Sequence, residues 1–520
     1  MSANALTVGN VLREQSRDRG DHTLLVCDDE RISYAGADRR SAELARALVG
    51  LGGGKGTHVG LLFGNGVPFI VGMLAAARIG AVVVPFSTFS TARELEQQLA
   101  DSDVAILLAA ESYRSHDYRA RLAEILNEDD YDADGRVFSS IAPQLRRVLF
   151  GDAAPAAGVD ATMLSALEHD VDGADPVAII YTSGSTSRPK GVVHTHAALL
   201  AHQQNLNSIR GLGPKDTLFC NSPFFWIGGF AFGVLATLAA GATLVCSNAT
   251  DAGAVLDVIE AEKPNVTNGF PAGVAGLARH PSFARRDLSS VRRGNLYPIM
   301  AADARPADPE LRHNMLGMTE AGGVLTISGD DTDQPESRRG SFGKPAPGFD
   351  TKIIEPDAGR VVERGEIGEL CIRGPYVMQR YHRRSREECF DADGWLHTGD
   401  LVRADRDGFL YFIGRRGSMI KTAGANVSPA EVEKAIAKVT GGMAAYVVGI
   451  PDDQRGQVVG AVIGLDEDVD VDVTSLRHDL EAELSSYKIP KRFAVLRRDT
   501  IPLLPSGKVD LAGLVKVFDA

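Results

Sequence analysis

Short apolar runs alternate with amphipathic helical segments over the first two thirds of the chain. The predicted buried strands are residues 58–63, 81–85, 104–109, 176–182, 242–246 and 265–268. Residues 67–78 are predicted to form a helix between the first two of them. Short apolar strands separated by helices indicate parallel βαβ units covered on both faces. The pattern therefore predicts an α/β domain of stacked αβα layers, with the Ala-, Gly- and Asp-rich residues 153–175 as a surface connection.

The pattern changes after about residue 340. Predicted strands at 350–354 and 369–373 lie close together between Gly-rich turns, which indicates a small β subdomain. A further α+β unit begins near Gly417. Its predicted elements are helices at 429–438 and 474–484 and strands at 444–450, 458–465 and 492–496. We expect an N-terminal domain over residues 1–417 and a small C-terminal domain over residues 418–520.

Residues 217–250 contain no charged side chain, and the stretch is long enough to cross a membrane. Asn221, Pro223 and the Gly228–Gly229 pair interrupt it. A turn, a buried helix and a buried strand in an α/β core account for it better than a membrane span. The N-terminal residues also lack a basic-then-apolar signal pattern. We therefore expect a cytoplasmic protein without a transmembrane segment.

Composition excludes several classes of protein. A chain of 520 residues is too long for one compact core, and 44% hydrophobic with 24% charged residues is ordinary for a globular enzyme. The net charge of -13 and the lack of a Lys/Arg block argue against nucleic-acid binding. Five scattered cysteines without a CxxC pair indicate reduced thiols. His194 and His196 could face one way on a strand, but no third metal ligand stands at useful spacing.

The sharpest motif is YTSGSTSRPKG at residues 181–191, between a predicted strand and a helix from about Ala197. Gly184 and Gly191 let the backbone approach a ligand, while N–H groups, hydroxyls and Lys190 suit phosphate oxygens. The spacing differs from the P-loop motif GxxxxGK[ST]. Composition alone would also fit a solvated Ser/Thr-rich loop, so the order of the residues carries the argument.

This loop resembles the signature loop of the adenylate-forming superfamily: acyl-CoA synthetases, luciferases and nonribosomal peptide adenylation domains. The resemblance covers about residues 6–514, and further motifs follow in the family's order. They are GMTE at 317–320, WLHTGD at 395–400, GR at 414–415, TAGANVSP at 422–429 and LPSGK at 504–508. Taken alone, each motif also fits a purely structural role: a glutamate at a helix start, a turn aspartate or a surface lysine. Their common order favours the family.

The resemblance implies a role for each matching residue. Glu320 would coordinate Mg²⁺, Thr319 would contact the α-phosphate of ATP, and Lys508 would be the catalytic lysine. Gly424 would lie where coenzyme A enters, and Ser418 would be the hinge about which a mobile C-terminal domain rotates between two half-reactions. The implied ATP or AMP contacts are Thr182, Ser183, Gly184, Ser185, Thr186, Lys190, Gly317, Met318, Asp400 and Arg415.

The chain departs from the family pattern at four places. Leu316 stands where the family has an aromatic residue that stacks on adenine, and residues 293–298 (RGNLYP) replace a Gly-rich segment. The adenine contacts are therefore open. Ser418 replaces the usual hinge aspartate, and Ser187 replaces a frequent glycine in the phosphate loop.

The segment PFFWIGG at residues 223–229 would line the acyl pocket. Amino-acid-activating relatives place an aspartate close to Trp226 to pair with the substrate ammonium, and Trp226 cannot supply that charge. An ammonium buried without a partner would cost about 3–5 kcal/mol. The implied pocket residues are Phe225, Trp226, Gly228 and Phe270, with Phe224 and Phe230 as further aromatics. They indicate a fatty, aryl or alicyclic acid, although each could instead fill the core.

The implied activity is ATP-dependent activation of an apolar carboxylic acid, followed by thioester formation with coenzyme A. A carrier protein or an amine as acyl acceptor is the alternative, because the adenylation residues would be the same. Coenzyme A is preferred because no carrier domain is fused after Leu514. A non-catalytic acyl-nucleotide sensor is disfavoured, because the family's functional residues are intact: Lys190, Glu320, Asp400, Arg415 and Lys508. The sequence leaves open the oligomeric state, a homodimer included.

Overall fold

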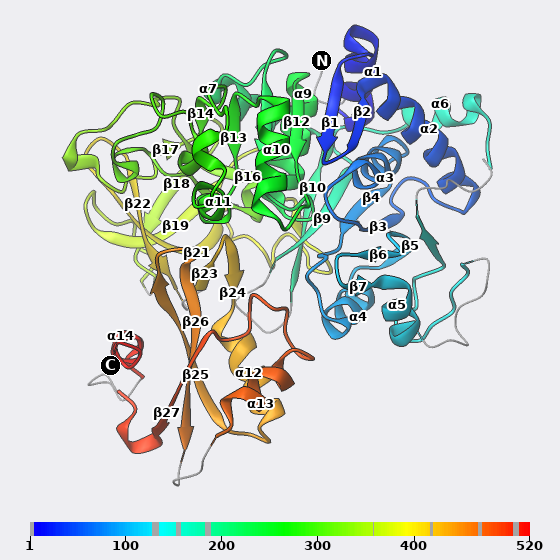
Figure 1. The fold of residues 1–520 in the computed structure, drawn as a ribbon. Coiled ribbons are helices and arrows are strands. Elements are labelled where there is room, and N and C mark those ends of the chain that lie inside the picture. Colours follow the sequence, from blue (N-terminus) through cyan, green and yellow to red (C-terminus); the bar gives the residue numbers. More distant parts are fainter. Residues whose placement is uncertain are drawn as a thin grey trace. The chain divides into compact units, whose positions relative to one another are not determined.

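The structure is a computed structural model. It describes residues 5–126, 135–151, 158–182, 189–356, 358–416, 420–465, 471–502 and 509–519. The chain divides into two compact units (Figure 1). Unit 1 comprises Met1–Thr88, Leu99–Tyr181 and Gly191–Gly414; unit 2 comprises Phe89–Gln98, Thr182–Lys190 and Arg415–Ala520.

Two largely parallel sheets form the framework of unit 1. In spatial order, the first contains β14 (Arg293–Gly294), β13 (Val266–Asn268), β11 (Thr217–Cys220), β12 (Thr243–Cys246), β1 (Thr23–Cys27) and β2 (Glu30–Ser33). The second contains β20 (Arg380–Tyr381), β10 (Lys190–Thr195), β9 (Pro176–Thr182), β4 (Val82–Pro85), β3 (His58–Leu62), β5 (Val104–Ala109) and β8 (Arg147–Phe150). The parallel pairing predicted from the apolar runs is confirmed at β3–β4, β3–β5 and β4–β9.

A layer of helices lies between the two sheets. Helix α3 (Val67–Arg78) is apolar on all sides, and its residues are buried along nearly its whole length. A helix of this kind must be covered all round. One core cluster joins α3 to side chains of both sheets and of α1 (Val8–Arg19), α2 (Tyr34–Gly50) and α7 (His196–Arg210). The outer face of the first sheet packs on α10 (Ala252–Glu262) and α11 (Pro271–Ala278). The predicted αβα layering is confirmed.

Smaller antiparallel sheets follow in unit 1, and the second of them confirms the β subdomain predicted after residue 340. One contains β15 (Leu316–Met318), β16 (Gly323–Ile327) and β17 (Lys344–Pro345). Another contains β18 (Asp350–Ile354), β19 (Ile367–Arg373), β21 (Leu396–Ala404) and β22 (Leu410–Arg415).

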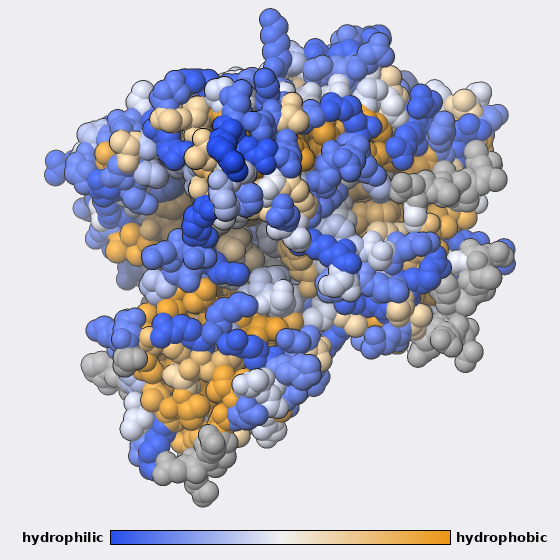
Figure 2. All heavy atoms as spheres, in the orientation of Figure 1, coloured by the Kyte–Doolittle hydropathy of each residue, from blue (hydrophilic) through white to orange (hydrophobic). Residues whose placement is uncertain are grey.

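Unit 2 is an α+β unit. Its sheet contains β24 (Ala425–Val427), β23 (Ile420–Thr422), β26 (Gly456–Leu465), β25 (Ala444–Asp452) and β27 (Arg492–Arg497). Helices α12 (Pro429–Val439) and α13 (Val473–Leu480) pack on one face through one hydrophobic cluster, and α14 (Leu511–Lys516) packs through another. Figure 2 shows a mostly hydrophilic surface, with hydrophobic side chains gathered over the sheet of this unit.

In two stretches the structure differs from the prediction or adds detail to it. The expected surface connection contains a helix, α6 (Ala161–His169), because Asp160 caps it by accepting the N–H of Met163 and Leu164 anchors it in the core. The uncharged stretch forms α8 (Ile227–Gly229), a π-helix at Phe230–Leu235, α9 (Ala236–Ala240) and β12. The helices in the described part of the chain include none long and apolar enough to cross a membrane.

Candidate functional site

The strands on either side of the Ser/Thr-rich loop belong to the second sheet. Thr182 is the last residue of β9, and Lys190 is the first residue of β10. The Gly191 carbonyl accepts the N–H of His382 at 2.7 Å, and a Cβ on Gly191 would lie 2.7 Å from the Ile179 side chain. A glycine is therefore needed where the chain leaves the loop.

The predicted magnesium ligand Glu320 lies in the turn between β15 and β16. Positive φ angles of 69° at Gly322 and 129° at Gly323 let the chain reverse there. The half-buried Glu320 side chain accepts the hydroxyl of Tyr381 at 2.8 Å, and its backbone carbonyl accepts the N–H of Met378 at 2.8 Å. Both ends of Glu320 are thus fixed by the chain around β20.

Residues Leu316, Gly317 and Met318 form β15, immediately before that turn. Gly317 is exposed, whereas Leu316 and Met318 are buried. Both buried side chains belong to a hydrophobic cluster with Val192 of β10 and with side chains of β19 and β21. This cluster brings together the strand after the phosphate loop, the GMTE segment and the TGD segment. The Leu316 side chain, at the family's stacking position, is part of this core.

Asp400 lies in a bulge of β21. The register against β19 shifts at Thr398–Asp400, where Gly399 has a φ of 73°. The Thr398 hydroxyl donates to the Leu370 carbonyl at 2.7 Å, and the Glu369 carboxylate accepts the Gly399 N–H at 3.0 Å. Bulges of this kind re-aim side chains and are common next to active sites. Asp400 is 3% exposed. The bulge, and not the regular alternation of side chains along a strand, therefore decides the direction of its side chain.

Two asparagines hold the loop that follows β13 in the first sheet. Asn295 donates to the Gly269 carbonyl at 2.7 Å and accepts the Gly269 N–H at 3.1 Å. Asn221 donates to the Phe270 carbonyl at 3.1 Å and accepts the Phe270 N–H at 2.9 Å. The atypical RGNLYP segment thus has a clear role, because its asparagine fixes the backbone at the carboxyl end of β13. Ligands of open α/β sheets bind at such ends.

An aromatic corner forms between this loop and the segment before α8. The ring centroids of Trp226 and Phe270 are 5.9 Å apart at 89°, and those of Phe225 and Trp226 are 5.6 Å apart at 76°. These are edge-to-face contacts, the favoured geometry for aromatic pairs. Phe225 is buried, while Trp226, Phe270 and Gly228 are half-buried. We call Phe225, Trp226 and Phe270 the aromatic corner.

The other two aromatics of this stretch fill the core. Phe224 and Phe230 have 0% exposure, and both rings make edge-to-face contacts with Phe69 of α3, at 5.5 and 6.4 Å. For Phe224 and Phe230 the structure favours the alternative that such aromatics fill the core, because both side chains are enclosed in the layer between the sheets.

In unit 2, the predicted residues Arg415 and Gly424 lie at the end of β22 and at the tip of the β23–β24 hairpin. Ala423 and Gly424 both have positive φ, 48° and 85°, as a type I′ hairpin turn requires. Gly424 is exposed. Further predicted residues lie outside the described ranges: Ser183, Gly184, Ser185, Thr186, Ser418 and Lys508.

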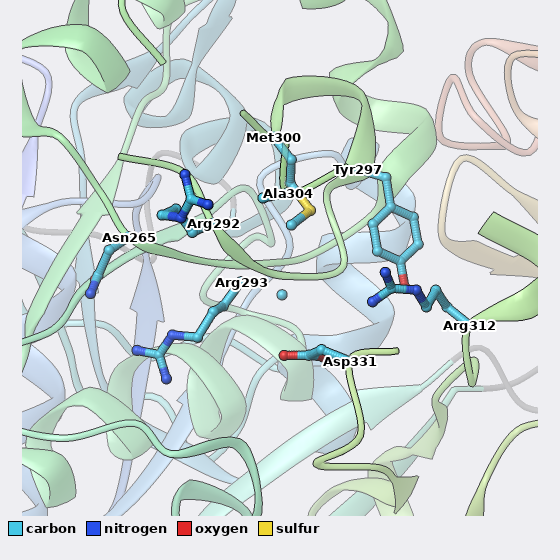
Figure 3. Close-up of a pocket in the computed structure, with 9 residues that line it drawn as sticks. Asn265, Arg292, Arg293, Tyr297, Met300, Ala304, Arg312 and Asp331 are labelled. Carbon is cyan, nitrogen blue, oxygen red and sulfur yellow. The ribbon is translucent and has the colours of Figure 1, made fainter. Parts of the chain in front are cut away.

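A separate pocket of about 420 Å³ opens at the edge of the first sheet (Figure 3). It is lined by Asn265, Arg292, Arg293, Gly294, Tyr297, Met300, Ala304, Arg312 and Asp331. Its arginines form ion pairs that offset their charge: Arg292–Asp303 at 2.9 Å, Arg293–Asp216 at 2.6 Å and Arg312–Asp333 at 2.7 Å. The pocket adjoins the amino ends of β13 and β14, whereas the asparagine-held loop follows the carboxyl end of β13. It is therefore distinct from the aromatic corner.

The donor set at Glu320 fits Mg²⁺ that arrives with a nucleotide. Proteins usually bind Mg²⁺ through one or two carboxylates plus substrate phosphates, and Glu320 supplies one half-buried carboxylate. Across the described ranges, no group of three or more His, Cys, Asp or Glu residues could hold a metal ion. His194 and His196 bond separately, to the Thr319 carbonyl and to the Val8 N–H.

Sequence reasoning missed Tyr381, Glu369 and Asn221. Each supports a site segment through one side-chain hydrogen bond or a pair of them, and no periodicity or spacing marks such a residue. The sequence marked Asn295 only weakly, because this residue lies in the segment that departs from the family pattern.

Comparison with known proteins agrees with this geometry. Residues 12–382 match the model of the family described as AMP-binding enzyme, and residues 431–508 match its C-terminal domain. The chain is 31% identical to the putative acyl-CoA synthetase YngI of Bacillus subtilis, over 97% of this chain and 95% of the relative. It is 31% identical to feruloyl-CoA synthase of an Amycolatopsis species, over 92% of each chain.

Among solved structures, the amide bond synthetase McbA from Marinactinospora thermotolerans superposes with a TM-score of 0.78. The two are 26% identical, over 98% of this chain and 99% of that one. The family model covers well over half of the chain, and the fold, the motifs and the relatives all agree with it. The chain therefore belongs to the AMP-binding enzyme family, the adenylate-forming enzymes that include acyl-CoA synthetases and ligases.

Proposed function

We propose that this enzyme activates an apolar carboxylic acid as its acyl-adenylate and then forms the thioester with coenzyme A. The observation that carries the acid class is the aromatic corner. Residues 221–230 and 268–271, which surround it in sequence, contain no charged side chain. An amino acid's ammonium group would find no partner there, at a cost of about 3–5 kcal/mol. Edge-to-face rings suit an aryl acid, which the likeness to feruloyl-CoA synthase also supports. Fatty and alicyclic acids come next.

In the first half-reaction, a carboxylate oxygen of the acid attacks the α-phosphorus of ATP, and pyrophosphate leaves as the α–β phosphoanhydride bond breaks. Such chemistry needs positioning and charge neutralisation more than acid–base groups. We assign Asp400 to the ribose, Thr319 to the α-phosphate and Lys508 to the charge that develops there. When bound at Glu320, Mg²⁺ supplies neutralisation of the phosphate charge. The loop at residues 182–190 binds the phosphates.

In the second half-reaction, the thiol sulfur of coenzyme A attacks the acyl carbonyl carbon, and the acyl–oxygen bond to AMP breaks. We assign the entry of the thiol to the hairpin tip at Gly424. We also place the domain boundary at residues 417–418, with Ser418 as the hinge, and the reaction in the cytoplasm.

The alternative is transfer of the acyl group to an amine or a carrier protein. The likeness to an amide bond synthetase structure supports an amine acceptor. The first half-reaction would be unchanged, so only the acceptor distinguishes the two proposals.

The test is an incubation of the purified protein with ATP, Mg²⁺ and a panel of aryl, fatty, alicyclic and amino acids. Pyrophosphate, AMP and acyl products are measured with coenzyme A, with an amine, or with neither. Coenzyme A-dependent turnover of an apolar acid, lost in Glu320→Gln, is the expected result. Amide formation, with faster turnover in the presence of the amine, would mean that the acyl acceptor is an amine and not coenzyme A. A preference for amino acids would overturn the acid class.

A further inference from the structure

The turn that carries Glu320 is held from one side by buried polar side chains. These side chains come from the segment directly after the phosphate loop. His194 Nε2 lies 2.7 Å from the Thr319 carbonyl, the Gln203 amide donates to the Gly322 carbonyl at 3.1 Å, and His202 Nε2 lies 2.9 Å from the Val324 carbonyl. All three side chains have 0% exposure. Three successive anchors thus fix the backbone of residues 319–324 to β10 and α7.

The protonation of the two histidines follows from their partners. A carbonyl oxygen only accepts, so each imidazole carries its hydrogen on Nε2 and donates it. Burial lowers the pKa of His194 and of His202 to about 4, which outweighs the opposing effect of these backbone hydrogen bonds. Both rings are therefore neutral donors near pH 7.

His194 is the anchor closest to the chemistry. Its partner, the Thr319 carbonyl, belongs to the peptide bond that joins Thr319 to Glu320. The His194 Nδ1 atom has no hydrogen-bond partner within the described part of the chain. A buried ring with one unsatisfied nitrogen costs free energy that an apolar side chain of similar size would not. What the histidine adds over such a side chain is the donor to Thr319.

We propose that His194 is a positioning residue for the adenylation step: its Nε2–H fixes the Thr319 carbonyl and thereby the direction of the Glu320 carboxylate. This inference rests on the proposed function of Glu320. The same strand reaches Glu320 by a second route, because β10 pairs with β20 at Val192–Tyr381 and Tyr381 donates to the carboxylate. The metal-binding carboxylate is thus tied on two sides to the strand that leaves the phosphate loop.

Loss of the imidazole donor leaves the turn itself intact, since the Thr319 carbonyl still accepts the Gly322 N–H at 2.9 Å. The direction of the Glu320 carboxylate is then fixed less firmly. A displacement of about 1 Å in a positioned group can reduce a rate by about 100-fold. We expect His194→Leu to lower kcat for adenylation about 10- to 100-fold, with a smaller change in KM for the acid.

The matched variants are His194→Leu and His194→Gln, because the glutamine amide can donate from about the position of Nε2. The control is His196→Leu, which removes an equally buried histidine that bonds the Val8 N–H and not the site. Adenylation is followed by pyrophosphate release. Hydrogen exchange of the 319–325 peptide and binding of Mn²⁺ with a non-hydrolysable ATP analogue are measured alongside, because neither needs turnover.

The expected result is at least tenfold slower adenylation in His194→Leu, with faster exchange at 319–325 and weaker Mn²⁺ binding. His194→Gln and His196→Leu should stay within threefold of wild type. Equal losses in His194→Leu and His194→Gln, or none in either, would overturn the inference. If the wild type formed no adenylate from any acid, the proposed function would fail. Hydrogen exchange would then decide the positioning role alone, and unchanged exchange in His194→Leu would reject it.

Discussion

Among the described residues of unit 2, Lys488 is the most deeply buried charged side chain, and its removal gives the sharpest test of the packing. The side chain is 8% exposed, and its ammonium group lies 2.6 Å from Glu94 and 2.8 Å from Glu431. Glu94 also accepts the hydroxyl of Ser485 and the N–H of Thr91. The Thr91–Glu94 pair is a capping box at the start of α4 (Ala92–Asp101). Lys488 thus joins this helix start to α12.

The expected cost of Lys488→Met follows from what it leaves behind. Glu94 and Glu431, with side chains 14% and 19% exposed, would face each other without a cation. Breaking a buried pair by removing one partner costs about 3–5 kcal/mol. The matched control is Lys438→Met, because Lys438 pairs with Glu483 at 2.7 Å but is 54% exposed. Glu483 is itself 12% exposed but keeps Arg93 as a second cation, so losing the exposed Lys438 should cost only the roughly 0.2–1 kcal/mol of an exposed pair.

The pair should also depend on pH in a defined window. Burial by itself raises the pKa of Glu94, but Lys488 and the hydrogen bonds outweigh it, and the pKa lies below its usual 4.5. Burial by itself lowers the pKa of Lys488, but Tyr487, Glu94 and Glu431 together outweigh it, and the pKa lies above its usual 10.5. The carboxylate contribution is present above about pH 4.5 and is lost as pH falls. The ammonium contribution is present below about pH 10.5 and is lost as pH rises.

The assay is hydrogen exchange at pH 7 on peptides from α12 and β26, because a chain of two units does not unfold in one step. Lys488→Met should reduce protection at least 100-fold, whereas Lys438→Met should reduce it less than sixfold. The double variant Lys488→Met with Glu94→Gln should recover part of the loss, since glutamine keeps the capping box without the charge. Equal effects of Lys488→Met and Lys438→Met would refute the reasoning from burial.

Three further predictions concern unit 1. Burial lowers the pKa of His194, His196 and His202 from 6.5 to about 4, so their stabilising contribution is full above pH 6.5 and falls on acidification. Between pH 6.5 and 5 the free energy of unfolding should fall by about 1.6 kcal/mol for each histidine, about 5 kcal/mol together. A guanidinium unfolding midpoint that stays constant over this pH range would contradict the burial argument. Tyr381→Phe removes a hydrogen bond to a carboxylate worth about 1.5–3 kcal/mol, so the free energy of unfolding should fall by up to that amount and adenylation should slow about 10- to 100-fold. Trp226→Ala opens the aromatic corner and should shift preference toward bulkier acids in a substrate panel; an unchanged chain-length preference would discard Trp226 as a gate.

The sequence predicted the layers and the motifs because both are local properties. Apolar runs of strand length, separated by helices, can be buried only in covered parallel sheets, and β3, β4, β5 and β9 follow. It failed where local composition resembles a connection, since α6 depends on the Asp160 cap and one buried leucine. It could not separate Phe224 and Phe230 from Phe225 and Trp226, because neighbours in one turn face different surroundings.

By itself, the sequence determined the fold class and the motif order that identifies an adenylate-forming enzyme, since these depend on residue types at fixed spacings. Only the tertiary structure decided how Glu320, Asp400 and Phe270 are held. Their supports are Tyr381 and His194, Glu369, and Asn221, respectively. Each support lies 30 to 125 residues along the chain from the group that it bonds. Such hydrogen bonds form only when strands from distant segments come together, and a single side chain far away in sequence leaves no periodic signal.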